Sequence, residues 1–217
     1  MSKKLADTIA LALIKHSDTR HPLPVLSYGL QILINTLIKI VMITIIGWVL
    51  HILLELYIMI FFFGSFRMIT GGVHAHTFFK CLTISLVSFV LLILLSSYTL
   101  PFFIENKFII LLSLFLFGTM ITWLYVPARW GNRRFSKKRI TVSKWLSISY
   151  LALILLSVWC IPAHSTINKL QEISWIAVMG ITWQCILVTP WGYALFDRIE
   201  RITLLKGGDN NVAKNEG

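Results

Sequence analysis

Six long apolar segments constrain the fold of this chain more than any other feature. They lie near residues 30–50, 52–66, 82–100, 107–126, 146–163 and 173–195. A helix needs roughly 20 mostly apolar residues to cross the hydrocarbon core of a bilayer, a length that all but the short second segment approach. Hydrophobic residues make up 57% of the chain and charged residues only 13%, which lies outside the usual balance of soluble proteins. The sequence therefore predicts an all-α integral membrane protein with six transmembrane helices.

The segment before the first span is expected to form an amphipathic helix in the membrane interface. Leu5, Ile9 and Leu13 recur at helical spacing, and charged residues of this stretch lie off that face. A frayed, solvated tail is the alternative. At the other end, residues 206–217 are polar and without periodicity, which is typical of a disordered tail. We therefore expect one membrane-embedded domain over residues 1–205 and no separate soluble domain.

The positive charges predict the orientation, because Lys and Arg in short loops are retained on the cytoplasmic side. Of the twenty, four precede the first span, two follow the second, seven lie between residues 127 and 145, and four follow residue 195. Only Lys107 and Lys169 fall in the loops on the other side, and Lys39 lies within the first span. Both termini should then be cytoplasmic. The net charge of +11 fits anionic lipid headgroups and does not indicate nucleic acid.

Cys81 has the surroundings of a reactive thiol. The three cysteines are an odd number, which argues against a disulfide framework. Cys160 and Cys185 lie within predicted spans, where a cysteine usually acts as a small packing residue. Cys81 instead lies at the cytoplasmic mouth of the third span, close in sequence to the cations Arg67 and Lys80. Nearby cations and histidines favour the thiolate, which is the nucleophilic form.

Two adjacent glycines, Gly71 and Gly72, should break the helical path before Cys81. On one continuous helix His74 and Cys81 would be separated by about 10.5 Å of rise, too far for a hydrogen bond. The break allows His74 to leave the helix and fold back over Cys81. Thr77 can cap a new helix, which puts Cys81 near its first turn, at the positive end of the helix dipole. The histidine and the cysteine could then act as base and nucleophile.

The pattern HAH at residues 74–76 also raises the alternative of a metal site, because two imidazoles can share one ion. No acidic residue occurs between Glu55 and Glu105, and the pair lacks a third protein ligand. We therefore expect no metal. We expect His76 to be a polar residue at the interface, although it competes with His74 for the role of base.

A second cluster of functional interest is ARWGNRRFSKKR, residues 128–139, which places six cations on the same side of the membrane as Cys81. Two interpretations stay open. The loop can be a topology signal that also binds anionic lipids. It can alternatively dock an acidic peptide at the membrane surface, where charge pairs are less screened than in bulk water.

Together these motifs resemble the signature of the accessory gene regulator B (AgrB) family. The chain contains the pattern R-x-x-x-G-G-x-H-A, followed by a cysteine seven residues after the histidine. The matching residues are Arg67, Gly71, Gly72, His74, Ala75 and Cys81. The segment YVPARWGNRR is similar to the family's Tyr-x-Pro segment and its Asn plus basic residue, here Tyr125, Pro127, Asn132 and Arg133. The chain departs from the family at Arg134, where proline is frequent.

The resemblance implies a cysteine endopeptidase of the bacterial cell membrane that processes the precursor of a cyclic autoinducing peptide in quorum sensing. Cys81 would cleave an AgrD-like propeptide at the carboxyl end of the future signal, with His74 as base, through an acyl-enzyme thioester. A thiol or hydroxyl of the peptide would then displace Cys81 and close a thiolactone or lactone ring. No cofactor is implied, since one thioester exchanges for another. The residues assigned to substrate binding are Arg67, Gly71, Gly72, Arg133, Arg134, Lys137 and Lys138.

Two alternatives belong to other functional classes. In a small peptide transporter or permease, GGVHAH would form a re-entrant gate whose histidines sense protons. A non-enzymatic adaptor of a sensor complex gives no reason for Cys81 beside His74. The sequence leaves the oligomeric state open, with a homodimer as one arrangement, and it leaves open any third catalytic residue.

Overall fold

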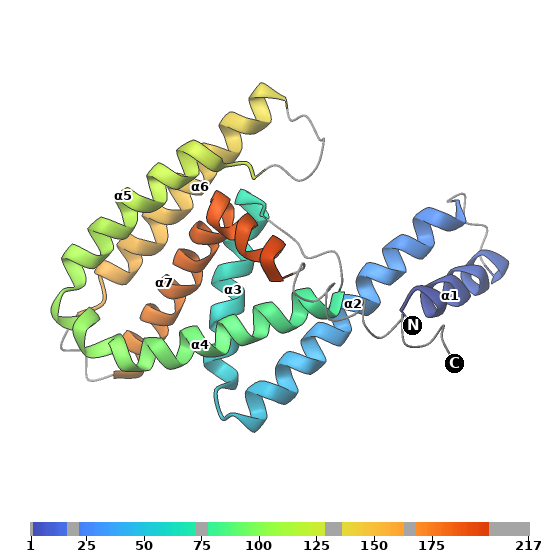
Figure 1. The fold of residues 1–217 in the computed structure, drawn as a ribbon, viewed down its shortest axis with the longest axis horizontal. Coiled ribbons are helices and arrows are strands. Elements are labelled where there is room, and N and C mark those ends of the chain that lie inside the picture. Colours follow the sequence, from blue (N-terminus) through green and yellow to red (C-terminus); the bar gives the residue numbers. More distant parts are fainter. Residues whose placement is uncertain (1, 17–21, 73–77, 129–135, 163–167, 200–217) are drawn as a thin grey trace, which may run out of the picture. The chain divides into compact units, whose positions relative to one another are not determined.

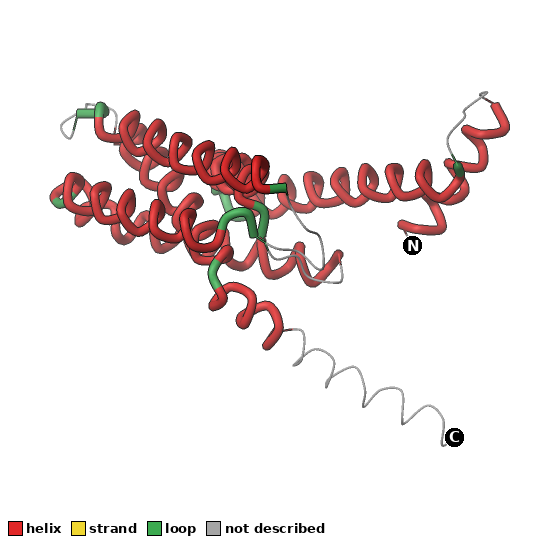
Figure 2. The backbone as a smooth tube through the Cα atoms, turned by 90° about the horizontal axis from the view of Figure 1, so that it is seen from above, coloured by secondary structure: helices red, strands yellow, loops and turns green. Residues whose placement is uncertain are grey.

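The chain is helical throughout the part that the structure describes. This computed structural model describes residues 2–16, 22–72, 78–128, 136–162 and 168–199. Within those ranges only helices and connecting loops occur, and no strand is present (Figure 2). The helices are α1 (Ser2–His16), α2 (Leu23–Val49), α3 (Leu53–Thr70), α4 (Phe78–Glu105), α5 (Lys107–Tyr125), α6 (Lys137–Trp159) and α7 (Asn168–Val188), and residues 190–199 form a further helical segment (Figure 1).

Six of these helices, α2 to α7, are long and apolar enough to cross a membrane. The predicted fold class is therefore confirmed. The contacts divide the chain into two compact units, Met1–Leu53 and Leu54–Gly217, which are described separately below. The single domain expected over residues 1–205 stays a prediction.

The first unit consists of α1 packed along α2. Small residues make this close approach, since Ala6 and Ala10 are fully buried, and the hydroxyl of Ser27 donates a hydrogen bond to Asp7. The apolar positions that define the predicted amphipathic face remain largely exposed: Leu5, Ile9 and Leu13. The predicted amino-terminal helix is thus present, and its contact with α2 leaves that apolar face available. Its location in the membrane interface stays a prediction.

Several helices of the structure begin or end at other residues than the apolar windows. α2 begins at Leu23, directly after Pro22, and its second residue is Pro24. Proline at the first helical positions favours the start of a helix. α6 begins at Lys137, nine residues before the predicted span, because Ser136 accepts a hydrogen bond from the amide of Arg139 as an N-cap. α7 ends at Val188, short of the predicted residue 195, and the chain turns there before Pro190. Caps and prolines set these ends, whereas a hydropathy window measures only apolar length.

The second unit is organised around α7, which is the most buried candidate span. Residues buried within the protein make up 67% of its apolar window, against at most 28% in the others. α7 contacts α4, α5 and α6, and Gly180 allows it to approach α3, since a Cβ at that glycine would lie 3.0 Å from the carbonyl oxygen of Met59 (Figure 1). Trp175 stacks on Phe103 of α4 at 4.3 Å and donates to the hydroxyl of Thr99. This central helix positions the candidate site.

Candidate functional site

The helix break predicted at the two glycines is present at the end of α3. α3 ends at Thr70, and both Gly71 (φ +74°) and Gly72 (φ +153°) have backbone conformations that residues with side chains rarely adopt. The next described residue, Phe78, begins α4. Cys81 is the fourth residue of α4 and is half-buried. It therefore lies in the first turn of a helix, as predicted.

Two of the residues assigned to this segment lie outside the described part of the chain. His74 and Thr77 both fall within residues 73–77. The same holds for His76. The pairing of His74 with Cys81 and the cap at Thr77 therefore stay predictions.

A buried glutamine of α7, Gln184, connects the end of α3 to the bundle. Its side chain is fully buried, and its amide nitrogen donates to the hydroxyl of Thr70 at 2.9 Å and to the carbonyl oxygen of Gly71 at 2.7 Å. Its amide oxygen accepts from Arg67 at 3.3 Å. The Gly71 carbonyl directly follows the end of α3, and this donor from α7 satisfies it. The glycine break is thus held by a side chain from the central helix.

The structure brings the glycine segment together with the beginning of the basic loop. The amide of Ala128 donates to the carbonyl oxygen of Thr70 at 2.9 Å. Gly71 lies directly against Ala128, because a Cβ at this glycine would approach the Ala128 carbonyl oxygen to 3.3 Å. The side chains of Val126, Ala128 and Val188 form a small apolar cluster beneath this junction. Gly71 and Ala128, which is the first residue of the second cluster and lies 57 residues further along the chain, are therefore neighbours in the structure.

Arg67 is the cation of this site. It lies in the last turn of α3, its guanidinium carbon is 5.6 Å from the centre of the Phe63 ring, and its nitrogen bonds Gln184. The guanidinium also interacts electrostatically with Cys81 and with Tyr193. Arg67 and Cys81, both assigned from the sequence, are thus brought together.

Tyr193 joins the site from the helical segment that follows α7. The turn at Thr189 reverses the chain, with the amides of Gly192 and Tyr193 donating to the Thr189 carbonyl oxygen. Gly192 lies so close to α7 that an added Cβ would be 2.5 Å from the Leu187 Cα. Burial raises the pKa of the Tyr193 hydroxyl above its usual value, and the cation of Arg67 acts in the opposite direction. The phenol is therefore protonated at neutral pH and can donate a hydrogen bond.

The described end of the basic loop is exposed. Ser136, Lys137 and Lys138 are exposed at the beginning of α6, where they can meet a partner or a lipid surface. Arg133 and Arg134, together with Asn132, lie in residues 129–135, outside the described residues. Their proposed contacts with substrate stay predictions.

The other two cysteines have different surroundings. Cys185 is buried in the bundle, as expected for a packing residue. Cys160 was expected to pack within a span, and this is wrong, because α6 ends at Trp159 and Cys160 is an exposed C-cap. None of the three cysteines, all of which are described, forms a disulfide. Among the described residues no group of three His, Cys, Asp or Glu side chains could hold a metal ion.

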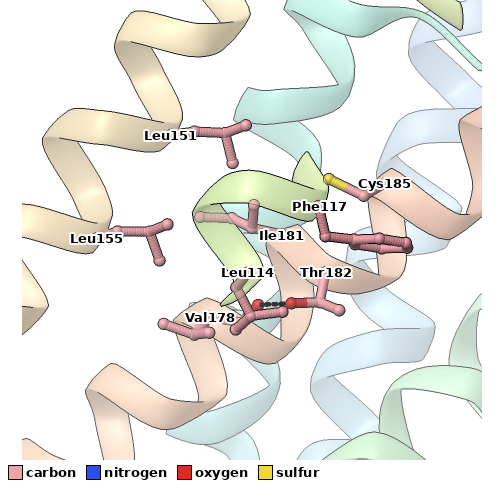
Figure 3. Close-up of a pocket in the computed structure, with 8 residues that line it drawn as sticks. All are labelled: Leu114, Phe117, Leu151, Leu155, Val178, Ile181, Thr182 and Cys185. Atoms are coloured by element: carbon pink, nitrogen blue, oxygen red, sulfur yellow. Dashed lines mark hydrogen bonds between the residues drawn. The ribbon is translucent and has the colours of Figure 1, made fainter. Parts of the chain in front are cut away.

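A pocket inside the bundle lies apart from Cys81 (Figure 3). Its interior volume of about 10 Å³ is the space of about one water molecule, so it cannot hold a peptide. Apolar side chains from three helices form most of its lining: Leu114, Phe117, Leu151, Leu155, Val178, Ile181, Thr182 and Cys185. We regard it as a packing defect of the core.

Sequence reasoning did not identify three residues of the site: Thr70, Gln184 and Tyr193. A glutamine in an otherwise apolar span is a signal, because a polar group in a membrane span usually faces the bundle interior and has a partner. That signal could have singled out Gln184 without naming its partners. Tyr193 carried no comparable signal, since aromatic residues are common at the ends of spans.

Comparisons with known proteins match almost the whole chain. The family model described as Accessory gene regulator B matches residues 2–188. An AgrB-like protein of Clostridium perfringens strain SM101 is 26% identical over 211 residues, which cover 94% of this chain and 96% of the relative. AgrB-like protein 2 of Clostridium perfringens strain 13 has the same identity and coverage. No solved structure matches this chain.

Proposed function

We propose that this chain, which belongs to the accessory gene regulator B family, is a membrane cysteine endopeptidase. Its substrate is an AgrD-like propeptide, cleaved at the carboxyl end of the future autoinducing peptide. Cys81 is the nucleophile and His74 the general base. The observation that carries the proposal is the position of Cys81 in the first turn of α4 beside the Arg67 guanidinium.

Two local effects support Cys81 as the nucleophile. The first turn of a helix carries unpaired amide N–H groups and the positive end of the helix dipole, both of which favour an anion. Arg67 adds a full positive charge close by. Positive charge at this position also stabilises the negative charge that develops when the sulfur attacks a carbonyl carbon.

The reaction proceeds through a thioester. Cys81 Sγ attacks the scissile carbonyl while His74 takes the thiol proton, and the imidazolium then protonates the leaving amine. The released carboxyl-terminal fragment leaves an acyl-enzyme thioester on Cys81. A thiol within the bound peptide gives its proton to His74, attacks the acyl carbon and displaces Cys81, which closes a thiolactone ring. A peptide hydroxyl in the same position would give a lactone.

The buried part of the site and the basic loop have separate tasks in this proposal. Arg67 stabilises charge near Cys81, and the backbone at Gly71 and Gly72 lines the position of the scissile bond. The basic loop, which starts at the Ala128–Thr70 hydrogen bond, brings positive charge to the same site and attracts an acidic propeptide tail. The residues proposed for that contact are Arg133, Arg134, Lys137 and Lys138.

The proposed location is the bacterial plasma membrane. The six candidate spans and the family describe a multi-pass membrane protein. The distribution of Lys and Arg supports cytoplasmic termini, and with them a cytoplasmic site that meets its substrate before export. The mechanism uses no cofactor, and a homodimer is compatible with it.

Replacement of the two reacting residues tests the proposal. Cys81→Ala and His74→Ala should each lower cleavage of a co-expressed, carboxyl-tagged propeptide by roughly a thousandfold or more, and the double variant should be no worse, because residues that act as one unit are non-additive. Mass spectrometry of the released tail measures the cleavage. Cys160→Ala and Cys185→Ala are the matched controls and should retain most activity. If membranes containing normal amounts of Cys81→Ala still release the tail, the peptidase mechanism is wrong and the peptide-transporter alternative is favoured.

A further inference from the structure

Gln184 makes more polar contacts at the site than its place in an apolar span requires. It is fully buried in α7, and both ends of its amide are used: the nitrogen by Thr70 and by Gly71 just after α3, the oxygen by Arg67. A buried amide without partners is costly in an apolar setting, so these bonds hold the two helices in one register. A leucine or methionine would pack in the same place without forming them.

The geometry around Gln184 leaves little freedom to Arg67. A Cβ on Gly72 would lie 3.1 Å from Arg67 Nη1 and 3.3 Å from Gln184 Nε2, so the glycine backbone closes the third side of the guanidinium. The Phe63 ring lies 5.6 Å from the guanidinium carbon. Arg67 is therefore held by a hydrogen bond, a ring face and a glycine while its charge reaches Cys81.

From this arrangement we infer that Gln184 is a positioning residue for the reaction of Cys81. Its amide fixes the Arg67 guanidinium and the Gly71–Gly72 turn relative to each other, and thereby holds in place the cation that interacts with Cys81. The inference rests on the proposed function for its role in catalysis, and it makes a prediction about Cys81 that needs no propeptide.

The test measures alkylation of Cys81 by iodoacetamide in detergent-solubilised protein whose other two cysteines are replaced by alanine. Gln184→Met keeps the length and volume of the side chain but removes the amide. We expect alkylation of Cys81 to slow by about tenfold, because the cation that interacts with Cys81 is then no longer held by an amide. Gln184→Asn keeps an amide, but its side chain is one methylene shorter and cannot reach Arg67 and the end of α3 together. This variant should also slow the alkylation of Cys81.

Gln171→Met is the matched control. Gln171 is also a buried glutamine of α7, its amide donates to the carbonyl oxygen of Pro162, and it lies about 20 Å along the helix from Gln184. This variant should alkylate at the parent rate even if it lowers thermal stability. A purely structural role for Gln184 would instead lower the folded fraction and leave the alkylation rate of folded protein unchanged.

The outcomes separate the two proposals. Parent alkylation rates in folded Gln184→Met and Gln184→Asn would overturn the positioning role; if the methionine variant does not fold, the asparagine variant decides alone. With the co-expressed propeptide, we expect kcat to fall by about tenfold and KM to change by less than about twofold, since only the reactive step depends on Arg67. If the Gln184 variants slow alkylation but the parent protein cleaves no propeptide, the positioning role is supported and the peptidase function is contradicted.

Discussion

Replacing Gly72 by alanine tests whether the close packing at the end of α3 controls activity. The added Cβ would meet Arg67 Nη1 at 3.1 Å and Gln184 Nε2 at 3.3 Å, and the backbone φ of +153° is one that alanine rarely adopts. The methyl group can be accommodated only if the guanidinium moves or the backbone rotates. Either change separates Arg67 from its position beside Cys81.

The size of the effect follows from the backbone strain. A residue with a side chain in such a sparsely populated region costs about 1–3 kcal/mol. If that energy favours the displaced arrangement, the competent population falls by about 5- to 150-fold. We therefore expect Gly72→Ala to lower the rate of propeptide cleavage within that range, while the protein still reaches the membrane.

Gly64→Ala, within α3, is the matched control. A Cβ at Gly64 meets no atom within 4 Å, and alanine in a helix interior is more favourable than glycine by up to about 1 kcal/mol. This variant should keep full activity and equal or better thermal stability. Cleavage rate, amount of protein in the membrane and thermal melting in detergent would be measured for both variants. Equal cleavage by the two would refute the argument that Gly72 confines Arg67.

Three further changes test other parts of the structure. Neutralising four cations of the basic loop together should lower propeptide cleavage most at low salt, because the attraction of an acidic tail is screened by ions; equal rates at every salt concentration would reduce the loop to a topology signal. The four are Arg133, Arg134, Lys137 and Lys138. Single cysteines placed near Gly72 or Asn132 should not react with an impermeant reagent added outside intact cells, and labelling there would invert the proposed orientation. Ser65→Ala and Tyr150→Phe should each lower stability by about 0.5–1.5 kcal/mol, since their hydroxyls are 2.6 Å apart between α3 and α6. Thermal melting should show the double variant to be no less stable than either single variant, because the bond between the two hydroxyls is already lost in each.

Local chemistry explains why much of the fold was predictable from the amino-acid sequence. A span is recognisable by its length and apolarity, and each of the six was found without knowledge of its neighbours. The glycine pair signalled the end of α3 because only glycine readily adopts the φ values found there. The same break predicted that Cys81 lies near the start of the next helix, where it is the fourth residue. These features depend on residues close together in the chain.

The helix ends were less predictable, and so was the fate of Cys160. Ser136, which determines where α6 starts, lies outside the apolar windows. Pro190, where the chain turns after α7, lies inside the window 173–195, and apolar length alone does not reveal that turn. Cys160 looked like part of a span because its neighbours are apolar. In the structure α6 ends at Trp159, one residue before Cys160, and this cysteine is exposed.

Only the tertiary structure decided how the site is assembled. Gln184 meets Thr70 and Gly71 across more than 110 residues of sequence, and Ala128 joins them from a third element. In an apolar span every face of the helix is compatible with lipid, so the pattern of residues does not reveal which face turns inward. The buried amide of Gln184 resolves that choice, because it has to find polar partners, and the Thr70 hydroxyl, the Gly71 carbonyl and Arg67 supply them.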